Sequence, residues 1–167
     1  MTLSLQRISL LPLALTALLL GGCSASSLLT SVGDILAGRG VVSTPLQGIQ
    51  VVSMPDANQT SSTRVDIVFI YKPELKAMLP KKANEWFARK DEFHANLWRD
   101  MDIVSLEVPP AYVIDPVKLP QRYGSALQVT VFANYLSKKG RKPLDLTGRT
   151  KPRLTLLAKK MNLQEVK

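Results

Sequence analysis

The chain has 167 residues, including a single cysteine and a single histidine, and carries a net charge of +9 at pH 7. One cysteine excludes a disulfide within the chain, and one histidine excludes a metal site built from several imidazoles. The length allows one sizeable core, so we expect a single domain whose stability comes from packing.

The N-terminal segment has the pattern of a secretory signal. Arg7 is its only charged residue, and the uncharged run over residues 8–20 is too short to span a bilayer comfortably. Leu20-Gly21-Gly22-Cys23 follows this run and resembles the bacterial lipobox. We therefore predict a signal peptide over residues 1–22, cleavage after Gly22, and diacylglyceryl and N-acyl (palmitate) groups on Cys23. A signal cut elsewhere, or an anchor that is never cut, is the alternative.

The residue after the cysteine indicates the membrane to which a lipoprotein is sorted. In the sorting rule that the lipobox resemblance implies, Asp at this position favours the inner membrane, whereas Ser24 is compatible with export. We expect an outer-membrane lipoprotein that faces the periplasm. Residues 23–48 form the predicted lipidated N-terminus and tether, which reaches ~80 Å when fully extended. Apolar residues at helical spacing over 26–37 leave a short helix and a flexible linker as equal alternatives.

The predicted β-rich domain covers residues 49–160, and residues 161–167 are expected to form a frayed tail. The strongest strand, over 65–71, is almost continuously apolar apart from Asp66, which indicates the middle of a sheet. Residues 127–136 alternate and predict a half-buried strand. Further strands are expected at 49–54, 102–108 and 153–158, with an edge segment at 111–114.

One amphipathic helix is predicted between the second and third strands. Pro80 is placed in its first turn, and apolar residues from Ala83 to Met101 fall near one face. This pattern is expected to pack Trp86 and Trp98 against the sheet or at its margin. Together these elements predict a mainly β or α+β domain.

The sequence offers no catalytic constellation that we would assign, so we predict that the protein is not an enzyme and uses no metal. His94 fits the rim of the helix's apolar face, and Gly124-Ser125 lacks the flanking glycines of a nucleophile elbow. Asp100 and Asp102 fit two solvated carboxylates at a helix-to-strand junction. Asp66 is either solvated, the reading we favour, or buried with a partner.

Most of the positive charge lies near the C-terminus. Residues 138–167 hold ten basic and two acidic residues, whereas residues 24–137 hold eleven of each. The basic residues Lys138, Lys139, Arg141 and Lys142 are therefore candidates for contact with a partner or an anionic surface. Export excludes nucleic acid, which leaves lipid headgroups, lipopolysaccharide phosphates or an acidic protein. A purely solubilising face is the alternative.

The order of these features resembles the outer-membrane lipoprotein of bacterial type VI secretion systems. The resemblance rests on the lipobox, the tether, the apolar strand, Trp86-Phe87 and the return through Val104-Ser105-Leu106, with Val129 to Tyr135 as a late strand. It implies a two-sheet, antiparallel β-sandwich-like domain with a helix packed on it. It also implies loops that hold the periplasmic domain of an inner-membrane secretion subunit. The Asn-Pro segment and Gly-rich loop of that family are missing, so no contact residue is carried over.

Two functions follow as expectations. The first is a lipid-anchored, non-catalytic assembly factor that fixes a secretion-type envelope complex to the outer membrane. The alternative is a lipoprotein that binds lipid or lipopolysaccharide through its basic C-terminal region.

Overall fold

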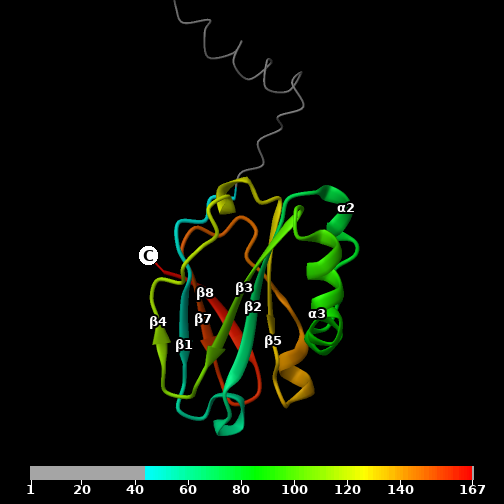
Figure 1. Ribbon diagram of the computed structural model, residues 1–167. Coiled ribbons are helices and arrows are strands. Elements are labelled where there is room, and N and C mark those ends of the chain that lie inside the picture. Colours follow the sequence, from blue (N-terminus) through cyan, green and yellow to red (C-terminus); the bar gives the residue numbers. More distant parts are fainter. Residues whose placement is uncertain (1–43, 167) are drawn as a thin grey trace, which may run out of the picture. The chain divides into compact units, whose positions relative to one another are not determined.

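Two four-stranded sheets face each other in the computed structural model, which describes residues 44–166 (Figure 1). The first sheet has the order β4-β1-β7-β8, formed by Val113–Ile114, Gln50–Ser53, Pro152–Leu156 and Met161–Glu165. The second has the order β3-β2-β5-β6, formed by Met101–Val108, Thr63–Ile70, Gln128–Ala133 and Leu144–Asp145. All pairings are antiparallel except that of β1 with β7. The predicted antiparallel β-sandwich-like fold is confirmed.

Strand β2 lies in the middle of its sheet, as its apolar run predicts. It pairs with β3 on one side and β5 on the other, so that Val65 is opposite both Leu106 and Ala133. Val65, Ile67 and Phe69 enter the core between the two sheets, together with Leu154 and Leu156 of β7. Side chains of a strand alternate between faces, so the intervening residues of β2 point to the outer face of the sheet.

That outer face is covered by helix α3 (Ala83–Leu97), which follows the short helix α2 (Pro73–Lys76) (Figure 1). A second cluster of buried residues forms beneath α3 and includes Val68, Ile70, Trp86 and Phe132. The predicted amphipathic helix packed on a sheet is thereby confirmed.

The boundaries of the helical region differ from the prediction. Pro73 begins α2, and Pro80 precedes α3, which starts at Ala83, so Pro80 is not in the first turn of that helix. At the other end, Met101 is the first residue of β3. Only one of the two tryptophans is packed: Trp86 is buried, whereas Trp98 is 57% exposed because the helix has ended at Leu97.

Strand β5 is buried on both faces, so the prediction of a half-buried strand is wrong. Val129 and Val131 lie in the core between the sheets. Phe132, on the other face, stacks on Trp86 with ring centroids 4.8 Å apart. The alternation of the sequence is real, but α3 covers the face that carries the more polar residues.

The remaining elements are short. Within residues 44–166, the connections between strands contain three 3-10 helices, η1 (Ala57–Thr60), η2 (Tyr123–Ser125) and η3 (Lys138–Arg141). Strand β4 forms the predicted edge segment. The prediction of a frayed tail after Lys160 is wrong, because β8 pairs with β7 from Met161 opposite Leu156 to Glu165 opposite Pro152.

Candidate functional site

The predicted lipidation residue Cys23 and the cleavage residue Gly22 lie outside the described residues. The predicted contact residues after β5 lie within them, in and next to η3. The other sites that the sequence suggested, around Asp66, His94, Asp100 and Asp102, are described as well.

The structure brings part of the basic C-terminal segment together with a second basic segment. Lys138, Arg141 and Lys142 line a pocket of about 430 Å³ whose other walls are Lys81, Lys82 and Asn84. Lys81 and Lys82 directly precede α3 and Asn84 is in its first turn, more than fifty positions earlier in the chain. Lys139 is on the same turn but does not line the pocket. We call this hollow, lined by five cations and Asn84, the basic pocket.

The turn that presents the basic pocket has a fixed shape. A Cβ atom at Gly140 would lie 2.2 Å from Cγ of Tyr135, so only glycine fits against this ring. The Ser137 hydroxyl caps η3 by accepting a hydrogen bond from the Lys139 amide. Arg141 donates from Nε to the Tyr135 carbonyl at 3.4 Å and from a terminal nitrogen to the Leu136 carbonyl at 3.3 Å. The guanidinium is thus held at one place on the pocket wall.

The basic pocket contains uncompensated positive charge. Across residues 44–166, no carboxylate lies within ion-pair distance of Lys81, Lys138, Arg141 or Lys142. Lys82 alone has such a partner, Glu85, at 3.6 Å and at the surface. Sequence reasoning missed Lys81 and Lys82, because a linear count of charge does not show that the start of the helix lies beside η3.

Asp66 is buried and paired, so the favoured interpretation of a solvated strand face is wrong. The residue is only 1% exposed because α3 covers its face of the sheet. Its carboxylate accepts a hydrogen bond from Nε1 of Trp86 at 2.9 Å. Lys90, one helical turn further on, places Nζ 2.9 Å from the same carboxylate. These partners satisfy a charge that would otherwise be costly to bury.

Lys90 also touches a serine, which raises the question of nucleophilic catalysis. Its Nζ donates to Oγ of Ser105 at 2.7 Å, in a hollow of about 370 Å³ over β2 and β3. A lysine that activates a serine must accept its proton. Here the same Nζ is also paired with the buried Asp66 carboxylate at 2.9 Å, so its contacts join the helix to both strands. We infer that the contact holds α3 on the sheet.

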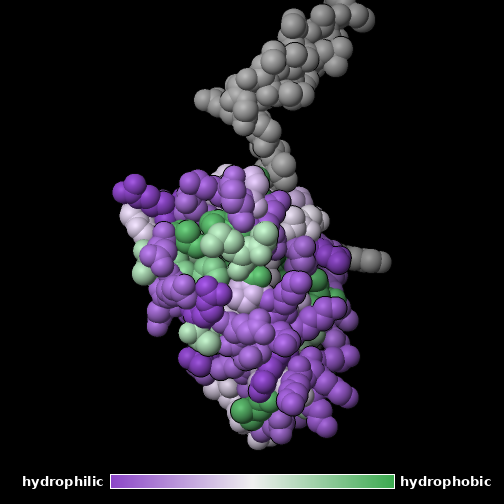
Figure 2. Space-filling model, turned by 90° about the vertical axis from the view of Figure 1, so that its right-hand side faces the viewer, coloured by the Kyte–Doolittle hydropathy of each residue, from purple (hydrophilic) through white to green (hydrophobic). Residues whose placement is uncertain are grey.

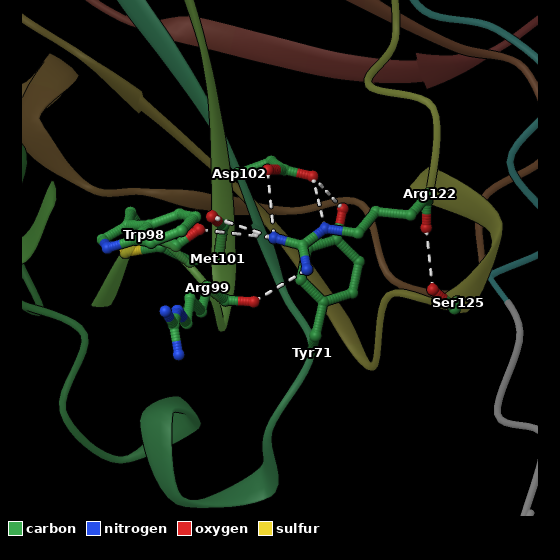
Figure 3. Close-up of polar contacts among 7 residues, drawn as sticks. All are labelled: Tyr71, Trp98, Arg99, Met101, Asp102, Arg122 and Ser125. Carbon is green, nitrogen blue, oxygen red and sulfur yellow. Dashed lines mark hydrogen bonds and ion pairs between the residues drawn. The ribbon is translucent and has the colours of Figure 1, made fainter.

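The two aspartates at the end of α3 are paired separately. Asp100 forms an ion pair with Lys72 at 3.0 Å. Asp102 accepts hydrogen bonds from the Tyr71 hydroxyl at 2.6 Å and from Arg122 Nε at 3.0 Å (Figure 3). They are therefore not a pair of freely solvated carboxylates, as the sequence suggested, but partners of cations from neighbouring connections.

Arg122 joins the long loop before β5 to the end of the helix. Figure 3 shows its guanidinium over the Tyr71 ring, 4.1 Å from the centroid, with further hydrogen bonds to the carbonyls of Arg99, Trp98 and Met101. Partial burial tends to raise the pKa of Asp102, but hydrogen bonds from Arg122 and Tyr71 outweigh it and hold the pKa below its usual value. Burial and the bond to Asp102 together raise the pKa of Tyr71.

His94 and a metal site are the remaining candidates that the sequence analysis considered. His94 is exposed on α3, near the rim of the buried face. Within the described part of the chain, no cluster of three or more histidine, cysteine or acidic residues has the spacing to hold a metal ion. Over the same residues, no helix is long and apolar enough to cross a membrane.

Comparison with known proteins finds likeness in structure and not in sequence. No protein-family model matches the chain, and no curated protein matches it. Among solved structures, the chain is similar to the type VI secretion lipoprotein TssJ1 of Pseudomonas aeruginosa, with 19% identity over 71% of this chain and 94% of the other, and a TM-score of 0.46.

Two further structures give similar values. The membrane-bound type VI secretion component Lip of Serratia marcescens has 10% identity over 71% of this chain and 96% of the other, at a TM-score of 0.47. The C-terminal domain of the type VI secretion protein TssM from EAEC has 16% identity over 70% and 98%, at a TM-score of 0.49.

Proposed function

We propose that the protein is a non-catalytic assembly factor, anchored by lipid in the outer membrane, that fixes a secretion-type envelope complex through its periplasmic domain. The observation that carries this proposal is Leu20-Gly21-Gly22-Cys23, a lipobox placed directly after an uncharged run. The resemblance of the sequence to type VI secretion lipoproteins supports the choice of complex. The partner is then the periplasmic domain of an inner-membrane subunit.

The lipid would supply one half of the attachment. Each buried methylene of an acyl chain contributes ~0.8 kcal/mol, and more than one chain is needed for a lasting anchor. The diacylglyceryl and N-acyl groups predicted on Cys23 would meet this requirement. The sandwich would supply the other half, a rigid body with its own core.

Backbone strain suggests where the protein contact lies. Asn58, Gln59 and Thr60, between β1 and β2, have φ angles of 48°, 59° and 62°. Left-handed backbone costs non-glycine residues roughly 1–2 kcal/mol each, and such strain gathers at binding sites. Asn58 holds the segment by accepting from the Leu136 amide at 2.9 Å and donating to the Ser62 carbonyl at 3.2 Å.

The exposed residues of this segment are Gln59 and Thr60. Figure 1 shows the β1–β2 connection at the end of the domain opposite to the point where the described chain begins. A domain tied at one end and bound at the other would act as a link between two structures. We therefore place the contact with the secretion subunit at this strained segment.

Replacement of Cys23 by Ser tests the proposal in the source bacterium. The variant should fold, as its melting temperature would show, but leave the outer-membrane fraction and lose most secretion. Ser26→Ala, three residues away, is the matched control and should behave as the wild type. Full secretion by the unlipidated variant would overturn the proposal.

The contact is tested separately. A Gln59→Ala/Thr60→Ala variant should remain in the outer membrane but co-purify less inner-membrane secretion subunit from detergent extracts. Unchanged co-purification would remove the contact from this segment and leave the lipid anchor unaffected.

A further inference from the structure

We propose that the basic pocket is a binding site for phosphate groups. Its walls come from two segments. One directly precedes α3 and holds Lys81 and Lys82, and the other is η3 with the residue after it and holds Lys138, Arg141 and Lys142. The proposal does not depend on the secretion partner suggested above, because it concerns a different ligand and a different set of residues.

The convergence of the two segments is the first argument. Like charges that are brought together repel one another, and nearby carboxylates normally offset this repulsion. In the described residues, only Lys82 has such a partner, and that pair is exposed at 3.6 Å. The other four cations of the basic pocket have no carboxylate within ion-pair distance across residues 44–166. An anion is the ligand that would complete this arrangement.

The second argument is the fixed position of Arg141 and of the turn that carries it. Gly140 packs so closely on Tyr135 that no side chain fits, and this contact sets the path of η3. The Tyr135 hydroxyl in turn donates to the Lys160 carbonyl at 2.8 Å, which ties the ring to the turn between β7 and β8. Arg141 is oriented by two backbone carbonyls. A donor that is already in place loses less freedom when it binds, and the exposed lysines around Arg141 add positive charge.

The donor set favours phosphate. Lysine ammonium groups act as point charges, whereas a guanidinium offers a planar fork that matches phosphate oxygens. The amide of Asn84 adds neutral donors to the same wall. A phosphomonoester carries up to two negative charges and several acceptor oxygens at one centre, so it can pair with several cations at once. A single carboxylate carries one charge and two acceptor oxygens.

The phosphate groups can belong to a lipid headgroup or to a soluble anion. Figure 1 shows η3, the orange turn, at the end of the domain away from the start of the described chain. Figure 2 shows mostly hydrophilic residues over the lower part of the face that carries α3, with a small hydrophobic group near its lower end. The lysines of the basic pocket are exposed, so either source can reach them, and the experiment separates the two sources.

The test compares single substitutions that change the charge equally. The mature full-length protein, in a non-ionic detergent at low salt, is titrated with pyrophosphate by calorimetry. Sedimentation of the Cys23→Ser form of each variant, without detergent, with phosphatidylcholine vesicles that contain or lack phosphatidic acid forms the second arm, and an acidic peptide forms a third. The variants are Lys81→Gln and Lys142→Gln in the basic pocket, with Lys139→Gln on the same turn outside it as the matched control.

Binding to pyrophosphate or to the vesicles that falls about tenfold in Lys81→Gln and Lys142→Gln, and less than about twofold in Lys139→Gln, would support the proposal. Binding in the pyrophosphate arm assigns a soluble source, and binding in the vesicle arm alone assigns a lipid. Equal losses of affinity in all three variants would overturn the proposal, since they would indicate attraction by the overall positive charge and not by the basic pocket. So would tighter binding of the acidic peptide, or binding in neither phosphate arm.

Discussion

The indole Nε1 of Trp86 donates a hydrogen bond to the carboxylate of Asp66 at 2.9 Å, and this bond joins α3 to the central strand β2. Asp66 is the one charged residue in the apolar part of that strand, and its position beneath the helix explains why the run is interrupted there. The covered face of the sheet thus contains a polar attachment within an otherwise apolar cluster.

Replacement of Trp86 by Phe should lower the free energy of unfolding by about 2–3 kcal/mol. The substitution removes the donor to a buried carboxylate and reduces the stacking on Phe132. Urea denaturation at pH 7 measures the change. Trp98→Phe is the matched control and should have little effect, because Trp98 is 57% exposed. Equal losses in the two variants would contradict the role given to the bond.

Lys90→Met should also destabilise the fold, by about 2–4 kcal/mol, because it leaves Asp66 buried with its charge uncompensated. Urea denaturation of Asp66→Asn and of the double variant completes a double-mutant cycle. We expect the double variant to lose much less than the sum of the two single variants. Simple additivity would show that the ion pair makes no energetic contribution.

The pair of Arg122 and Asp102 should contribute to the free energy of unfolding by an amount that depends on pH. The pKa of Asp102 is lowered in the fold, so its stabilisation is complete above the ordinary aspartate pKa and is lost as pH falls through the lowered value. Arg122→Gln should therefore cost about 1–2 kcal/mol at pH 7 and less near pH 3.

A residual, pH-independent loss in Arg122→Gln should remain, because the guanidinium also binds backbone carbonyls at the end of α3. Arg89→Gln breaks an exposed pair with Glu92 and should have a smaller effect at both pH values. A difference between wild type and Arg122→Gln that is the same at pH 7 and pH 3 would contradict the lowered pKa.

Gly140→Ala should destabilise the domain and displace η3. The new Cβ would meet the Tyr135 ring at 2.2 Å, and a clash in a packed site typically costs about 1–3 kcal/mol. Gly124→Ala provides the control, because nothing lies within 4 Å of its Cβ position. Thermal unfolding of both variants measures the effect. A neutral Gly140→Ala would mean that the turn shape is not fixed by this contact.

The sequence predicted those elements whose burial depends on local pattern. Strand β2 was recognisable because its apolar run is continuous, and α3 because Trp86 and Phe93 recur on one face. The alternation of β5 predicts one exposed face, because nothing in it indicates that a helix covers Phe132. Strand β8 was missed because its residues are mixed in polarity and gain order only by pairing with β7.

The candidate site shows the same limit. The sequence identifies Lys138, Arg141 and Lys142 as candidates because they are close together in the chain. It does not identify Lys81 and Lys82, because their place beside η3 depends on the packing of α3 against β5. Lys139 was grouped with the others by sequence, although the structure places it outside the pocket lining. Charge density along a chain therefore identifies a basic segment but not the shape of the site it forms.

Intact-mass analysis of the mature protein from fractionated envelopes tests the lipid-anchored link most directly. We expect a chain that begins at Cys23, carries a diacylglyceryl group and an N-acyl chain, and is recovered with the outer membrane. A mature chain that starts at another residue, or one that is recovered unmodified in the soluble fraction, would contradict the anchor on which the proposed function depends.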